Sequence, residues 1–346
     1  MISKKIVVTG LLLLSVVGLF VGMTALTSVE AAGGMKGTAY ISGHGGHLAI
    51  IDLATLKEPT DIEKDRIVIS EAGSEMEGKI AGMDFEAMKK GGGSHGAALV
   101  NNNKTLVVGL LNGKVVQYDI ATGKKTAPMD LGKKFCDAVV GPDGNIYFED
   151  MADGNVYVWD YKTMKAVDKM PVGASMCGIA WTRDNKKAFI SEMPTGVVYV
   201  YDWTTKKEIA KITDPEMTFL HQVALSPDGK SVWVTAPNEY DPGLKPGTHK
   251  PQIIVIDVAT NKITEKIVLP DDVRLHDIEF TPDGKTALIA ARTYKDDSLL
   301  VLMDVKTRKI EKRVSACLAC HKKAGVEVTI DNKSPLLCGI VVDWKK

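Results

Sequence analysis

The clearest chemical motif in the sequence lies close to its C-terminal end. Cys317, Cys320 and His321 form the pattern Cys-x-x-Cys-His, which attaches a c-type haem: the two thiols bond the haem, and the histidine binds the iron. A plain disulfide gives the histidine no role, and a zinc site would need a second Cys-x-x-Cys or His-x-x-His pair, which the sequence lacks. The motif therefore predicts one covalent haem c with His321 as an iron ligand.

A second set of metal-binding side chains occupies one position of an internal repeat. Six segments align as HGAALV, CDAVV, CGIAW, HQVAL, HDIEF and CGIVV, and their first residues form what we call the His/Cys ring: His95, Cys136, Cys177, His221, His276 and Cys338. Imidazole and thiolate are the donors that soft and borderline metals prefer. We expect a second haem or a metal there, with the three histidines as catalytic proton donors or ligands and the three cysteines as candidate metal ligands. The alternative is that this position only needs a small or flat semi-polar side chain.

The haem motif needs a pocket that its own surroundings are too short to provide. Residues 315–334 cannot form a cytochrome c domain, so the rest of the chain must supply it. His44 and His47 in the segment SGHGGH are the first candidates for a further iron ligand. The next candidates are Met76, Met83, Met88 and His249. The alternative for the methionines is the apolar face of a short helix.

The elements that position these residues are repeated about every 41 residues. An apolar residue followed by Asp-x-x-Thr-x-Lys, or a close variant, recurs six times, at Asp52, Asp119, Asp160, Asp202, Asp257 and Asp304. Each copy follows an alternating apolar run, the pattern of a half-buried strand, and the aspartate can cap a tight turn. A Pro-Asp-Gly turn or a close variant recurs out of phase, at 141–144, 182–185, 226–229 and 281–284. Four antiparallel strands per repeat are typical of a β-propeller blade.

The two ends of the repeated region complete one blade. The first repeat aligns with the second, third and fourth strands only, whereas the C-terminal segment PLLCGIVVDWKK matches the inner strand ASMCGIAWTRDN. Pairing these ends closes the sheet edges, which would otherwise invite aggregation. We predict an all-β fold, a β-propeller over residues 35–346 with six four-stranded blades. The C-terminal strand completes blade 1 and closes the ring. Seven blades are the alternative.

Three insertions interrupt the repeat, at residues 71–93, 238–250 and 315–334. In a propeller, loops between blades and loops between second and third strands emerge on the same face, where each inner strand also begins. Loops on a rigid scaffold are frequent sites of function. We therefore expect the haem motif and the His/Cys ring on one face, with the ring at the mouth of the central channel.

The N-terminal segment predicts export. Two lysines precede an apolar run from Ile6 to about Leu26, and a small-residue cleavage site ends at Ala31, so residues 1–31 have the pattern of a signal peptide. An uncleaved membrane anchor is the alternative. In both cases the rest is exported to the periplasm or an equivalent compartment. The formal net charge is zero and the basic residues are dispersed, which argues against nucleic-acid binding.

The repeated D-x-x-T-G-K and S-P-D-G motifs resemble those of the YVTN-type, or cytochrome d1-like, propeller family over about residues 35–346. The resemblance implies a propeller that binds haem d1 in some members and is cofactor-free in others. In the haem-binding members, histidines around the channel mouth contact the haem, and His95, His221 and His276 are similar in placement. The chain differs from these family members in two ways. It has six recognisable blades rather than seven or eight, and it carries its haem motif in the last interblade loop rather than in a separate cytochrome domain.

Together these features predict an exported c-type haem propeller in periplasmic redox metabolism. It would transfer electrons, or act as a haem-dependent oxidoreductase on a small molecule such as a nitrogen compound at the channel mouth; whether it is an enzyme stays open. Its expected partners are a redox protein or the subunits of a multi-haem complex. The protein would be attached to a membrane only if the signal peptide is uncleaved. The alternatives are a non-catalytic subunit of a multi-haem complex of the hydrazine synthase type, and a carrier of haem or metal in cofactor maturation.

Overall fold

The computed structural model describes residues 34–43, 46–61, 64–70, 92–173, 175–237, 250–270, 273–292, 298–316 and 337–345, with the backbone alone at 292, 298 and 337. The predicted export signal, most of the three insertions and the haem motif lie outside the described residues. The chain from Gly34 onward forms one compact unit. Its described residues contain no helix that could cross a membrane.

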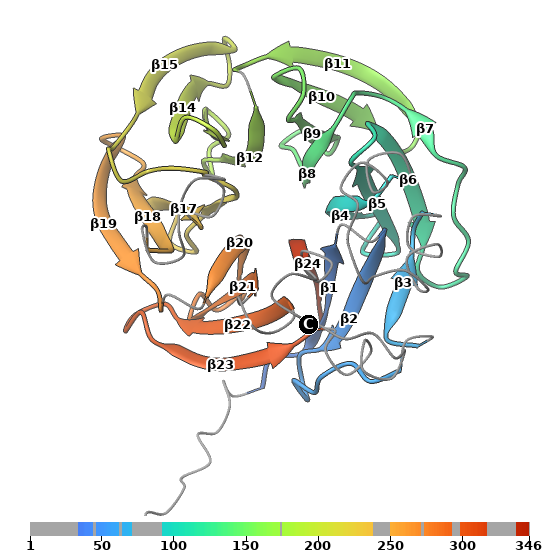
Figure 1. Ribbon diagram of the computed structural model, residues 1–346. Coiled ribbons are helices and arrows are strands. Elements are labelled where there is room, and N and C mark those ends of the chain that lie inside the picture. The colour runs from blue at the N-terminus through green and yellow to red at the C-terminus, as the bar shows by residue number, and fades with distance from the viewer. Residues whose placement is uncertain are drawn as a thin grey trace, which may run out of the picture. The chain divides into compact units, whose positions relative to one another are not determined.

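The strands form six four-stranded antiparallel sheets, which surround a central axis as the blades of a propeller (Figure 1). From the axis outward, blade 1 consists of β24 (Leu337–Trp344), β1 (Gly37–Gly43), β2 (His47–Asp52) and β3 (Arg66–Val68). Blade 2 consists of β4 (Ser94–Val100), β5 (Thr105–Leu110), β6 (Lys114–Asp119) and β7 (Met129–Asp130). Blade 3 consists of β8 (Phe135–Val140), β9 (Ile146–Asp150), β10 (Asn155–Asp160) and β11 (Lys165–Pro171).

The other three blades repeat this order. Blade 4 consists of β12 (Met176–Trp181), β13 (Lys187–Glu192), β14 (Val197–Asp202) and β15 (Lys207–Ile212). Blade 5 consists of β16 (Val223–Leu225), β17 (Ser231–Ala236), β18 (Gln252–Asp257) and β19 (Lys262–Val268), and blade 6 of β20 (Arg274–Phe280), β21 (Thr286–Arg292), β22 (Ser298–Asp304) and β23 (Ile310–Ser315). The prediction of six four-stranded blades is confirmed.

The ring closes as the sequence predicts. The C-terminal strand β24 is the inner strand of blade 1 and pairs with β1, with Thr38 opposite Asp343 and Tyr40 opposite Val341. One blade thus contains strands from both ends of the propeller, so the register of β24 fixes where Cys338 stands relative to the other inner strands.

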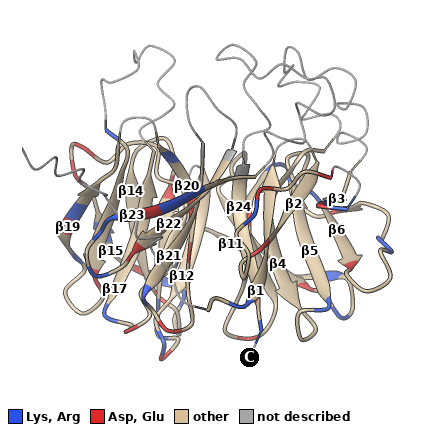
Figure 2. Cartoon of the chain, turned by 90° about the horizontal axis from the view of Figure 1, so that it is seen from below, with Lys and Arg blue, Asp and Glu red and all other residues tan. Residues whose placement is uncertain are grey.

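The core lies between neighbouring blades. One cluster, for example, packs Tyr147 and Val158 of blade 3 against Ile179, Trp181 and Tyr201 of blade 4. The second and third strands of a blade are buried on both faces and are therefore apolar almost throughout, as in β13 and β14. The outermost strands are exposed and charged, and Figure 2 shows Lys, Arg, Asp and Glu along β23 while β4 and β5 are nearly free of them.

The repeated aspartates are turn caps. Asp257 Oδ1 accepts hydrogen bonds from the backbone N–H and the hydroxyl of Thr260, at 2.8 and 2.7 Å. Asp119, Asp160 and Asp202 accept equivalent bonds from threonines in their own turns. The Thr260 hydroxyl bond lowers the pKa of Asp257 below its ordinary value. The Asp-x-x-Thr signature is thereby explained by the turn alone.

Candidate functional site

The six residues of the His/Cys ring come together at one end of the central channel. Each lies within two residues of the start of its inner strand, all six are buried, and together they line one small cavity of about 10 Å³. Because every blade presents the same register position to the axis, one repeat position in the sequence becomes one layer in space. The predicted ring is therefore formed.

The ring divides into two halves, each from three consecutive blades. In blades 6, 1 and 2, the donor atoms of His276, Cys338 and His95 all lie within 4.8 Å of one another, and the same holds for Cys136, Cys177 and His221 in blades 3, 4 and 5. The imidazoles of His221 and His276 join the halves, with ring centroids 3.9 Å apart. Among the described residues the ring thus offers two groups of three neighbouring donors rather than one group of six.

The two cysteines of one half are joined to each other. Cys136 and Cys177 form a disulfide between blades 3 and 4, and Cys177 Sγ lies 3.2 Å from His221 Nδ1. Cys338 in the other half is not part of a disulfide. In this oxidised form, a role of Cys136 and Cys177 as metal ligands would require reduction, because their sulfur atoms bond each other.

Each ring histidine is held by a hydroxyl from the preceding blade. Ser42 in β1 donates to the backbone carbonyl of His95, and Ser191 in β13 donates to that of His221. Thr235 in β17 donates to the carbonyl of His276 at 2.5 Å. The blades that precede the three ring cysteines carry Gly109, Glu149 and Ala290 opposite the equivalent inner-strand position instead. A Ser or Thr at this second-strand position thus accompanies a histidine in the next blade, a correlation that can be read from the aligned sequence.

A second layer lies directly below the His/Cys ring. Its members are the residues that follow the ring residues: Gly96, Asp137, Gly178, Gln222, Asp277 and Gly339. A Cβ atom at Gly96 would lie 2.2 Å from Asp137 Oδ1, and one at Gly178 would lie 2.0 Å from Gln222 Oε1. The glycines therefore make room for the longer polar side chains of neighbouring blades. This alternation of small and polar residues was also visible in the sequence and was missed.

Buried and half-buried carboxyl groups surround this layer. Desolvation and the neighbouring Glu149 raise the pKa of Asp137, while desolvation and Asp137 raise that of Asp277. Burial also raises the pKa of Glu149 to about 8 and that of Glu279 to about 7. Both carboxyl oxygens of Glu149 are buried without a hydrogen-bond partner among the described residues. These groups favour the protonated form near neutral pH, since charged carboxylates in an apolar interior are costly.

The acids connect the His/Cys ring to the rest of the channel. A larger cavity of about 610 Å³ runs along the inner strands toward the Pro-Asp-Gly turns and is lined by Asp137, Asp277 and Glu279. Asp137, Gln222 and Asp277 line both this cavity and the small one at the ring. The arrangement places imidazoles at one end of a channel and proton-holding carboxyl groups along it, which is suited to taking up and releasing protons.

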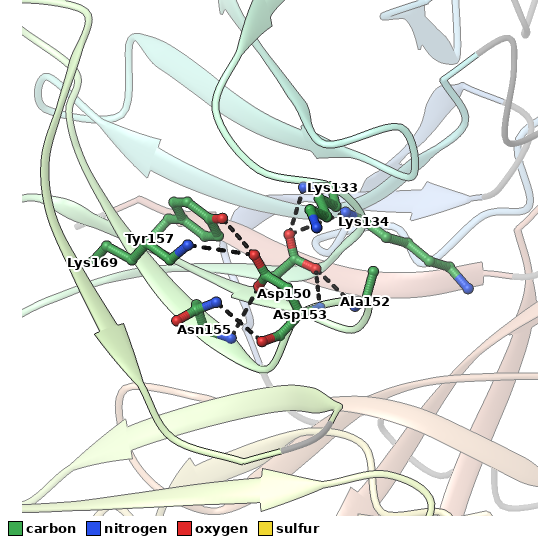
Figure 3. A network of polar contacts seen from close by, with 8 residues as sticks. All are labelled: Lys133, Lys134, Asp150, Ala152, Asp153, Asn155, Tyr157 and Lys169. Atoms are coloured by element: carbon green, nitrogen blue, oxygen red, sulfur yellow. Dashed lines mark hydrogen bonds and ion pairs between the residues drawn. The ribbon is translucent and has the colours of Figure 1, made fainter.

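The approach of the chain to Cys136 is fixed by a polar network at the end of β9 (Figure 3). Asp150 Oδ2 accepts from the backbone N–H groups of Lys133 and Lys134 at 2.6 and 3.1 Å, just before β8 begins. Its other oxygen accepts from the N–H groups of Ala152 and Asp153 at 2.7 and 3.2 Å. One buried carboxylate therefore ties the segment that precedes β8 to the turn that follows β9.

The remaining predicted site residues are not part of this layer. His47 is buried at the start of β2 and does not line the ring cavity. His44 and the haem-motif residues Cys317, Cys320 and His321 lie outside the described residues, as do Met76, Met83, Met88 and His249. Haem attachment and its further ligand stay predictions from the sequence.

Three comparisons with known proteins place the chain. No curated protein sequence matches it. Among solved structures, hydrazine synthase of Kuenenia stuttgartiensis is similar with a TM-score of 0.51 and 20% identity, over 62% of this chain and 63% of that one, which is a likeness of fold. The family model of the cytochrome D1 heme domain matches residues 115–326, more than half of the chain. The chain therefore belongs to the cytochrome D1 heme domain family.

Proposed function

We propose that the protein is an exported c-type haem propeller that transfers electrons in periplasmic redox metabolism. The observation that carries the proposal is the Cys317-x-x-Cys320-His321 motif in a chain that belongs to a haem-domain family. A haem held there would supply one-electron redox chemistry, and its axial ligands would set its potential. Residues 1–31 support export, and c-type haems are assembled on the exported side of the membrane.

The described residues limit where a second haem could lie. The cavity inside the His/Cys ring has the room of about one water molecule, and the six side chains around it are buried. A macrocycle does not fit inside the ring, so the three histidines do not enclose a haem in the described arrangement. A single metal ion is the cofactor that this space allows.

The residues of the chain contribute proton chemistry beside the redox centre. The imidazoles of His221 and His276 and the carboxyl groups of Asp137 and Asp277 lie around one small cavity. The pKa of Asp277 is raised by desolvation, which favours a proton there at neutral pH. Electron transfer to a small substrate at the channel mouth would draw protons from this set, with His221 as the proposed donor and with His95 and His276 as donors or metal ligands.

The test is haem content and turnover of the full chain, expressed in a host that attaches c-type haems. We expect one haem per chain by pyridine haemochromogen and intact mass. Changing Cys317 and Cys320 to Ala should abolish covalent haem, whereas changing Cys136 and Cys177 to Ser should retain it. A wild-type protein without covalent haem would refute the redox assignment. Turnover of nitrite or hydroxylamine by the loaded protein would support catalysis rather than electron relay.

A second candidate function is that of a non-catalytic subunit. The likeness of fold to hydrazine synthase favours it, because the resemblance to the YVTN-type propeller family implies cofactor-free members as well as haem-binding ones. In this case the propeller would be a docking scaffold in a multi-haem assembly. Purification from the native host under gentle conditions tests it: co-elution with multi-haem proteins and no turnover by the isolated chain favour the subunit, whereas a monomer with turnover contradicts it.

A further inference from the structure

We propose that His95, His276 and Cys338 form a mononuclear copper site on the propeller axis, distinct from the haem motif. The three residues come from consecutive blades, with Cys338 of blade 1 between His276 of blade 6 and His95 of blade 2. Their donor atoms lie within 4.8 Å of one another. Since bonds to a metal of this class are about 2.0–2.3 Å long, donors around one ion lie some 3–4 Å apart, and a small side-chain adjustment closes the site.

The donor set selects the metal. Two imidazoles and one thiolate are the ligands of trigonal copper sites, in which any further ligand is weak and distant. Zinc in structural sites takes four strong ligands, but the group of neighbouring donors has three members among the described residues. The carboxyl group of Asp277, which also lines the cavity, accepts the backbone N–H groups of Ile278 and Ile340, both at 2.6 Å, and so holds two strands together.

The surroundings hold the three ligands in place before any metal binds. Ser42 donates to the backbone carbonyl of His95 and accepts from the N–H of Gly339 at 3.0 Å, so one hydroxyl links the strand of His95 to that of Cys338. Asp277 links β20 to β24 in the same way, through Ile340. Thr235 holds the carbonyl of His276. Such outer contacts orient metal ligands and tune affinity.

Burial and space fit one ion. His95, His276 and Cys338 are each at most 6% exposed, and the cavity of about 10 Å³ that they help to line suits a single ion rather than a cluster. The disulfide takes Cys136 and Cys177 out of competition. Of the ring, this leaves one thiol, Cys338, between two histidines, which is the composition of the proposed site.

The experiment measures metal binding without reference to turnover. Purified full-length protein is stripped of metals, and Cu(I) and Zn(II) are titrated separately against chelators of known affinity. Bound metal is counted by mass spectrometry, and X-ray absorption at the copper edge identifies the ligands. The titration is repeated with Cys317 and Cys320 changed to Ala, because copper bound in that background cannot be held by the haem motif, and failure of haem attachment then leaves the test intact.

We expect one copper per chain with one sulfur and two imidazole ligands, bound more tightly than zinc. Cys338→Ser should remove the sulfur ligand and weaken binding at least about 100-fold, and Ser42→Ala should weaken it about 10–100-fold. His221→Gln, a ring histidine outside the triad, should retain copper. Binding below one copper per chain, tighter binding of zinc, a copper without sulfur in the wild type, or equal copper affinity in a folded Cys338→Ser protein would overturn the proposal.

Discussion

Replacing Glu149 by Gln should stabilise the protein at neutral pH and not at acid pH. Glu149 is fully buried, and neither carboxyl oxygen has a hydrogen-bond partner among the described residues. Burial raises its pKa from 4.5 to about 8 in the folded state. The unfolded chain therefore ionises Glu149 above about pH 4.5, whereas the folded chain keeps it protonated until about pH 8. Stability attributable to this group is present below pH 4.5 and is lost as the pH rises toward 8.

The magnitude follows from the pKa difference. At 1.36 kcal/mol per pKa unit, the free energy of unfolding should fall by about 3 kcal/mol between pH 5 and pH 7.5 because of Glu149. Glutamine has the same shape and cannot ionise, so the variant lacks this loss. Its buried amide costs some stability, but equally at both pH values. The gain of Glu149→Gln over wild type should thus grow by about 3 kcal/mol between the two pH values, or roughly 5 °C in Tm.

Urea unfolding of both proteins at pH 5 and pH 7.5, followed by tryptophan fluorescence, measures this difference. Glu208→Gln is the matched control, because the Glu208 side chain is 38% exposed and forms a surface ion pair with Lys211. It should change stability by the same small amount at both pH values. If Glu149→Gln also shifts stability equally at pH 5 and pH 7.5, the argument that Glu149 is held protonated by burial is wrong.

Three further outcomes follow from the structure. Gly178→Ala should lower stability by roughly 1–3 kcal/mol, because the new Cβ would lie 2.0 Å from Gln222 Oε1 and 2.9 Å from its Cα; an unchanged melting temperature would contradict the close contact. Cys177→Ser should cost about 4 kcal/mol, because the disulfide spans 41 residues, and reductant should destabilise the wild type similarly but leave the variant unchanged. The pKa of Asp257 is lowered, chiefly by the Thr260 hydroxyl, so its stabilising bonds are lost as the pH falls through that pKa. Asp257→Asn should therefore be less stable than wild type at pH 6 by thermal melting, with a gap that narrows toward pH 2.5; a constant gap would refute this account of the turn.

The fold could be predicted from the sequence because its signals are local and repeated. An alternating strand pattern and an Asp-x-x-Thr turn need only neighbouring residues, and six copies remove the ambiguity of any one. The pairing of β24 with β1 followed from matching the C-terminal segment to an inner strand. The alignment of His95 with Cys338 followed in the same way, since equal register in every blade places equal positions at the same height on the axis.

The tertiary structure decided how the members of the His/Cys ring are used. The alignment identified six candidate residues, but the width of the channel depends on how the six sheets pack. This packing brings Cys136 and Cys177 close enough to form a disulfide. It also places Cys338 beside two histidines. The unpaired Glu149 is likewise invisible in the sequence, because hydrogen-bond satisfaction depends on what the next blade presents. The sequence by itself determined the six blades, the height of the ring and the haem motif. Contacts between blades, made by residues far apart in the chain, determined which carboxyl groups are buried beside one another, which cysteines form a disulfide and which donor atoms lie close enough to hold a metal.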